Sequence, residues 1–116
     1  MESWERDFQW LRVRHFLKDK FKRTELPDMN AVLFLIGIRE LGQWKIKYTK
    51  EEKQDLMHIA TCRLLSNDGY YAFKGIDADG WPHWEVSGQV PAWDLKEQTE
   101  YLQEKIIQYF APILEQ

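Results

Sequence analysis

The chain has 116 residues, a formal net charge of −3 and one cysteine, and these totals already exclude several classes of protein. The length fits one domain with its own core, so we expect residues 1–116 to form a single globular helical domain. One cysteine excludes an internal disulfide, and no apolar run approaches the ~20 residues of a membrane-spanning helix. The N-terminal sequence has no apolar secretory segment, so a cytoplasmic location is the default expectation.

Residues 2–23 are predicted to form a long amphipathic helix with Ser3 as its N-cap. At helical spacing its apolar residues form two stripes on roughly opposite sides. The first stripe comprises Trp4, Phe8, Leu11 and His15, and the second comprises Trp10, Val13, Leu17 and Phe21. A helix with two apolar stripes must be covered twice. Either both stripes are buried within the domain, or the second stripe is a self-association face and the protein forms a homo-oligomer through this helix.

The most apolar stretch runs from Asp28 to Leu41, and it is predicted to be a buried central helix. Its eight middle residues, 31–38, are all apolar or glycine, whereas a surface helix would carry polar residues at every turn. Gly37 would cost up to ~1 kcal/mol relative to alanine at an exposed helical site. We therefore interpret Gly37 as a point where another helix passes closely.

The next two segments show a change of periodicity. Apolar and basic residues alternate between Gln43 and Tyr48, which favours a strand or an extended segment laid over the core. Thr49 followed by Glu52 forms a capping box, which predicts the start of a third helix that extends to about Ser66. Gly69 suits the left-handed position just beyond the end of that helix.

Residues 70–87 are short, aromatic segments on either side of an Asp77–Gly80 turn, and they predict a β-hairpin. A last helix is expected to begin at Ala92 or Asp94 and to end or kink near Phe110, because Pro112 cannot continue the backbone hydrogen bonding. The predicted fold class is therefore mainly α. It has four helices in one domain around the central helix 28–41, with the aromatic hairpin inserted between the third and fourth helices.

The aromatic hairpin and its flank supply the strongest functional hypothesis, a surface that binds a protein or peptide partner. The candidate partner-binding residues are Tyr71, Phe73, Trp81, His83, Trp84 and Trp93. The alternative is that most of these rings only fill the core. Local charge around them is net negative, which disfavours single-stranded nucleic acid because that ligand also needs a positive groove. The leading prediction is a non-enzymatic interaction module without a cofactor.

The rival hypothesis is a small metal-dependent or thiol enzyme. Its residues would be His58 and Cys62 on one side of the third helix, together with His83 and the Asp77/Asp79 turn. Against a metal site, the chain lacks the paired Cys/His spacings that structural zinc sites show. Against a nucleophile, Cys62 lies in the C-terminal half of its helix, where the helix dipole disfavours a thiolate.

Two further ligands receive little support from the sequence. When Asp77–Gly80 is aligned with a calcium loop, the first and last loop positions are Gly75 and Val86, where carboxylates are required. A nucleic-acid interface would depend on basic residues of the first helix, namely Arg12, Arg14, Lys18, Lys20, Lys22 and Arg23. With a net charge of −3, the chain has no global positive field to support such binding.

Overall fold

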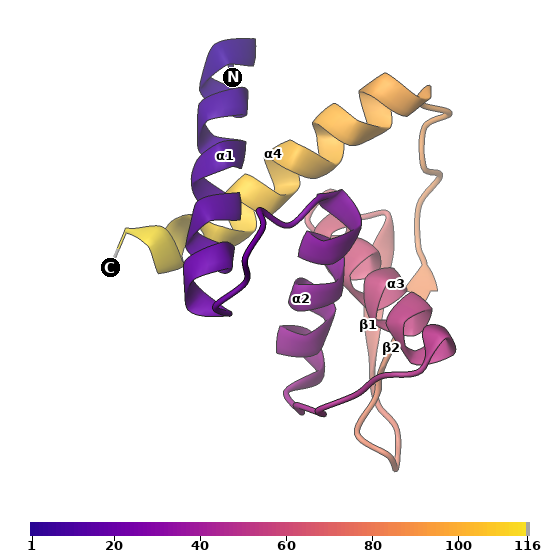
Figure 1. Ribbon diagram of the computed structural model, residues 1–116. Coiled ribbons are helices and arrows are strands. Elements are labelled where there is room, and N and C mark those ends of the chain that lie inside the picture. The colour runs from indigo at the N-terminus through magenta and orange to yellow at the C-terminus, as the bar shows by residue number, and fades with distance from the viewer. Residues whose placement is uncertain (116) are drawn as a thin grey trace. The chain divides into compact units, whose positions relative to one another are not determined.

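The computed structural model describes residues 1–115 and contains four helices and one hairpin (Figure 1). The elements are α1 (Ser3–Lys20), α2 (Met29–Leu41), α3 (Lys50–Ser66), β1 (Tyr71–Ile76), β2 (Pro82–Val86) and α4 (Leu95–Leu114). This confirms the predicted fold class, mainly helical with a two-stranded antiparallel hairpin between α3 and α4. Among the described residues, no helix is both long and apolar enough to cross a membrane.

The chain divides into two units, which we describe separately. The first unit consists of Met1–Asp28 and the segment from Pro91 onwards, and it contains α1 and α4. The second unit is Met29–Val90 and contains α2, α3 and the hairpin. The prediction that residues 1–116 form a single domain is not tested by this division and stays a prediction.

In the first unit, α1 packs against α4 and crosses it obliquely (Figure 1). Phe16 of α1 meets Phe110 of α4 with ring centroids 6.3 Å apart. Nearer the start of α1, the Arg6 guanidinium lies 3.5 Å from Glu100 and 3.6 Å from Glu104. Apolar burial and this half-shielded ionic contact together fix which side of α1 faces α4.

The ends of these two helices differ in part from expectation. Ser3 is not the N-cap of α1, because Glu2 occupies that position without a side-chain capping bond. The helix ends at Lys20, before the predicted residue 23, and Lys22 has a positive φ of 52°. α4 begins after Asp94, which forms a capping box with Glu97, and it continues past Pro112 to Leu114. Only Ile113 and Leu114 of the helix follow the proline, so the missing backbone donor interrupts little of the helix.

In the second unit, α2 packs on α3, and the two helices together supply most of the local core. Val32 and Ile36 of α2 are completely buried, as are Leu56 and Leu64 of α3. A Cβ added to Gly37 would lie 2.1 Å from the Leu56 carbonyl oxygen, a distance that no real Cβ tolerates. The predicted close passage of a helix at Gly37 is confirmed, and the passing helix is α3.

The segment between α2 and α3 is not a strand, so the first of the two forms predicted for it is wrong. Its backbone bonds to the Tyr48 side chain instead: Lys45 N donates to Tyr48 Oη over 2.9 Å, and Tyr48 Oη donates to Gln43 O over 3.3 Å. Tyr48 is buried and packs edge-on against Phe34, whereas Ile46 is fully exposed. The predicted capping box of Thr49 and Glu52 is present at the start of α3.

Candidate functional site

The hairpin is irregular at one position, and this irregularity decides which side chains share a face. Phe73 pairs with Trp84, but the next residue to pair is Gly75, opposite His83, so Lys74 forms a bulge. Gly75 has a φ of 119°, which favours glycine. Beyond the bulge, Ile76 pairs with Pro82. A regular strand would place Ile76 and Phe73 on opposite faces, and the extra residue brings them to the same one.

That shared face forms one wall of a pocket, which we call the hairpin groove. It has a volume of about 250 Å³ and is lined by Glu40, Arg63, Phe73, Ile76, Pro82 and Trp84. The strands supply the last four of these residues, α2 supplies Glu40 and α3 supplies Arg63. Phe73 and Ile76 remain exposed, with 51% and 67% of their surface accessible. The groove is therefore an apolar hollow that is open to solvent.

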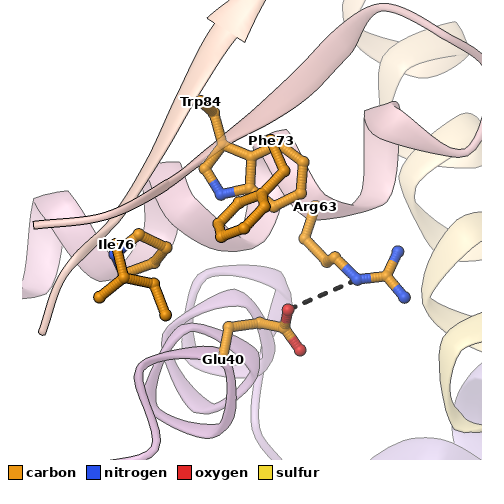
Figure 2. A pocket seen from close by; sticks show the side chains of 6 residues that line it. Glu40, Arg63, Phe73, Ile76 and Trp84 are labelled. Carbon is orange, nitrogen blue, oxygen red and sulfur yellow. Dashed lines mark ion pairs between the residues drawn. The ribbon is translucent and has the colours of Figure 1, made fainter.

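Figure 2 shows how the side chains surround the groove. Phe73 and Trp84 pack against each other between Ile76 on one side and Arg63 on the other, with Glu40 beneath them. The Phe73 and Trp84 ring centroids lie 5.3 Å apart, and the rings meet edge-on at an interplanar angle of 61°. The Trp84 Nε1 atom is covered and makes no hydrogen bond with the described residues. A buried donor without a partner costs about 1–3 kcal/mol.

The polar part of the groove is an ion pair between the two helices. Arg63 Nε lies 3.4 Å from Glu40 Oε1, and Arg63 Nη1 donates to Asn67 Oδ1 over 3.1 Å. Both side chains are partly shielded from solvent, so their attraction is screened less than that of a fully exposed pair. The groove thus presents apolar surface beside a charge pair whose net charge is zero.

The hairpin tip is organised by Asp77. Its Oδ1 accepts hydrogen bonds from the Asp79 and Trp81 backbone amides, at 2.9 and 3.0 Å. Its Oδ2 lies 2.8 Å from His83 Nε2, and an N–H there donates to the carboxylate. The His83 bond first, and then the Trp81 amide, hold the pKa of Asp77 below its ordinary value. Asp77 therefore acts as the internal brace of the turn.

His58 and Cys62 lie one turn apart on α3, as predicted, but in different surroundings. Cys62 Sγ is 3.5 Å from His58 Nε2, yet the cysteine is fully buried while His58 is exposed. Burial raises the pKa of the Cys62 thiol from 9.0 to about 11. The thiol is thus protonated near neutral pH, which is the opposite of what a catalytic nucleophile needs.

The predicted metal candidates occupy two local groups, His58 with Cys62 on α3, and Asp77 with His83 at the hairpin tip. Asp79 contributes its backbone amide to the tip. Within residues 1–115, no group of three or more His, Cys, Asp or Glu side chains is placed to hold a metal ion. The two-residue groups found here fall short of the three protein ligands that a catalytic zinc site uses.

The six predicted partner-binding residues are distributed over several places. Phe73 and Trp84 line the groove, whereas Tyr71 packs edge-on against His58 with ring centroids 6.3 Å apart. Trp81 and His83 belong to the tip that Asp77 organises. Trp93 lies in the other unit, where it stacks on Tyr101 at 4.3 Å.

Sequence reasoning missed four of the groove residues, Glu40, Arg63, Ile76 and Pro82. The signal for Ile76 was Gly75, because an isolated glycine within a strand often marks a bulge. Glu40 and Arg63 gave no signal of their own, since their pairing depends on how α2 and α3 pack.

No family model, no curated protein and no solved structure shows a significant match to the chain.

Proposed function

We propose that the chain is a non-enzymatic interaction module whose hairpin groove receives an apolar side chain of a protein or peptide partner. The observation that carries the proposal is the exposure of Phe73 and Ile76 beside a hollow of about 250 Å³. Two large apolar side chains lie on one face, next to Pro82 and Trp84, and exposure of this patch to water is unfavourable. Exposed apolar patches with polar neighbours are typical of interaction sites.

The size of the groove favours an anchoring side chain over a free small molecule. Ligand pockets in proteins commonly hold about 300–1,000 Å³ and enclose most of the ligand surface. The hairpin groove, at about 250 Å³, lies below that range and is open to solvent through Phe73 and Ile76. One leucine, methionine or phenylalanine of a partner fits such a hollow, while the rest of the partner lies across the rim.

The chemistry of the walls adds a polar requirement. Trp84 Nε1 lacks a hydrogen-bond acceptor among the described residues and lies beside Phe73. If the Phe73 ring turns aside when a ligand enters, a backbone carbonyl of the partner can accept that hydrogen bond. The Glu40–Arg63 pair balances its own charge, so the groove favours a neutral anchor over a charged one. A cytoplasmic setting belongs to the same proposal, because a single free cysteine suits a reducing compartment.

The test is a selection of random peptides against the full chain, followed by affinity measurements on matched variants. Ile76 and Val86 are both 67% exposed on the hairpin, but only Ile76 lines the groove. Ile76→Asp should weaken binding of the enriched peptides at least ~10-fold, because a carboxylate must be desolvated in the groove. Val86→Asp should leave their affinity within about twofold of wild type.

Two results would remove the basis of the proposal. One is a failure of the selection to enrich peptides with a shared apolar residue. The other is equal loss of affinity in Ile76→Asp and Val86→Asp, since the groove would then have no special part in binding. Circular dichroism of both variants shows whether the helices and hairpin remain folded.

A further inference from the structure

The first helix exposes the opposite stripe from the one expected to self-associate. Val13 and Leu17 of the second stripe are buried, at 0% and 2% exposure, so the expectation that this stripe is the association face is wrong. Trp4, Phe8 and Leu11 of the first stripe are 68%, 62% and 42% exposed. Their spacing places three large apolar side chains on one face of α1.

The α4 helix does not cover this face. At about 100° per residue, Arg6 and Val13 lie about 160–180° from Trp4 around the helix axis. Arg6 forms ion pairs with Glu100 and Glu104 of α4, which places α4 on the side away from Trp4. The stripe of Trp4, Phe8 and Leu11, continued by the exposed His15, is therefore an apolar face without a partner helix in its own unit.

Charged residues border the stripe on both sides, and their sign changes from negative to positive along the helix. Glu5 and Arg12 lie on one flank, seven residues apart, and Asp7 and Arg14 lie on the other flank at the same spacing. On both flanks the acidic residue is in the N-terminal half of the stripe and the basic residue is in the C-terminal half. A partner helix that runs in the opposite direction would meet this pattern with opposite charges.

We propose that two copies of this chain associate through α1 in an antiparallel pair. With the twofold axis between Gln9 and Trp10, Trp4 faces His15 of the second copy and Phe8 faces Leu11. In this arrangement equal flanks lie opposite each other, so Glu5 approaches Arg12 of the second copy and Asp7 approaches Arg14. Within its own copy Arg12 Nη2 donates to Leu114 O over 3.3 Å and Arg14 Nε donates to Pro27 O over 2.7 Å, so these ion pairs use the other N–H groups of each guanidinium. Each of these pairs forms twice because of the symmetry.

The parallel alternative brings like charges together. In a parallel pair, the flank of one helix that carries Glu5 and Arg12 faces the flank of the other helix that carries Asp7 and Arg14, at the same height along the axis. Glu5 would then approach Asp7, and Arg12 would approach Arg14, which is unfavourable on both sides. Charge complementarity on α1 thus selects a second, antiparallel copy of the chain over a parallel one.

The association should be weak. Four side chains of one helix cover less than the ~800 Å² per partner of a standard interface, and exposed charge pairs contribute little each. A dissociation constant of tens of micromolar, or about −6 kcal/mol, is the expected order. The surface lies in the first unit and shares no residue with the hairpin groove. Its test is therefore independent of the proposed function.

The experiment is sedimentation equilibrium of the full chain at concentrations up to about 200 μM, a range set by the expected dissociation constant. Wild type should approach twice the monomer mass of 14.0 kDa. Phe8→Glu should remain monomeric with an unchanged melting temperature, because Phe8 is exposed in the single chain. Phe73→Glu, which alters the hairpin groove, should dimerise as wild type does.

The direction of the pair is tested by reversing charges on one flank. Glu5→Lys should weaken dimerisation about 10-fold, and Glu5→Lys with Arg12→Glu should restore it, because the swapped charges attract again. A wild type that stays monomeric at the highest concentration overturns the proposal, as does a Phe8→Glu variant that dimerises normally. A double variant as weak as Glu5→Lys alone overturns the antiparallel arrangement.

Discussion

Gly37 is a residue at which two helices of the second unit approach each other closely. A β-carbon there would lie 2.1 Å from the Leu56 carbonyl oxygen and 2.6 Å from its carbonyl carbon. Both are backbone atoms, so relief requires a shift of the whole α3 helix. We predict that Gly37→Ala lowers the free energy of unfolding by about 1–3 kcal/mol, as overpacking does in well-packed cores.

Denaturant titration measures this change, and Asn30→Ala provides the control on the same helix. Asn30 is exposed, so its replacement should change the free energy of unfolding by less than about 0.5 kcal/mol. If Gly37→Ala is as stable as Asn30→Ala, the two helices are not in close contact at this position.

Cys62 gives a second prediction at the scale of one residue. Its folded pKa of about 11 lies above the ordinary value of 9.0 because the thiol is buried. Between pH 9.0 and about 11, therefore, the Cys62 thiol holds its proton more often in the folded chain than in the unfolded chain. The contribution of the buried thiol to the free energy of unfolding is fully present below pH 9 and is lost as the pH rises towards 11.

Urea midpoints across this pH range test the prediction, with Cys62→Ala as the reference. All other groups are the same in both proteins, so the difference between the two pH profiles reports on the thiol. Wild type should lose stability more steeply than Cys62→Ala. Parallel profiles would mean that the folded environment does not shift this thiol.

At the scale of the element, the hairpin depends on a side chain at its tip. Asp77 Oδ1 accepts a hydrogen bond from the Trp81 amide over 3.0 Å, beside two backbone bonds that also close the turn, from Asp77 N to Trp81 O and from Gly80 N to Asp77 O. We predict that Asp77→Ala raises hydrogen exchange at the Trp81 amide about 10-fold, the effect of losing one hydrogen bond of about 1 kcal/mol. Asp79→Ala should leave that exchange unchanged, because Asp79 joins the turn through its backbone. Equal exchange in the two variants would contradict the bracing role of Asp77.

Individual elements were predictable wherever local chemistry determines them. The α3 helix begins where the Thr49–Glu52 capping box indicates, and the hairpin lies within residues 70–87. Segment 43–48 could not be read in this way. Its alternating apolar and basic residues are typical of a strand, but its backbone forms hydrogen bonds with the hydroxyl of the buried Tyr48. That arrangement depends on the contact of Tyr48 with Phe34, which is distant in sequence.

The candidate site shows a similar division between local and tertiary causes. Phe73 and Trp84 were found from aromatic density, because both lie on the hairpin itself. Ile76 was missed because a one-residue bulge at Lys74 and Gly75 changes the face of the strand. Glu40 and Arg63 meet only through the packing of α2 on α3. The periodicity of a sequence does not show which residues of two separate helices come into contact.

At the scale of the whole molecule, the two units are predicted to unfold together. The predicted single domain requires one cooperative transition in differential scanning calorimetry. The calorimetric and van't Hoff enthalpies of unfolding should then agree. Two separate transitions would instead identify Met29–Val90 as an independently stable unit and refute the single domain.

The hairpin groove is proposed to bind an apolar anchor of a partner, and the Trp84 indole lies where it can report on that binding. The chain has six tryptophans, so a ¹H–¹⁵N spectrum shows six indole signals, and Trp84→Phe assigns the one from the groove. On addition of a selected peptide, the Trp84 signal should shift and its proton exchange should slow, because Nε1 gains an acceptor. The signal of Trp4 on α1 should stay in place. A peptide that binds while the Trp84 signal remains unchanged would contradict binding in the hairpin groove.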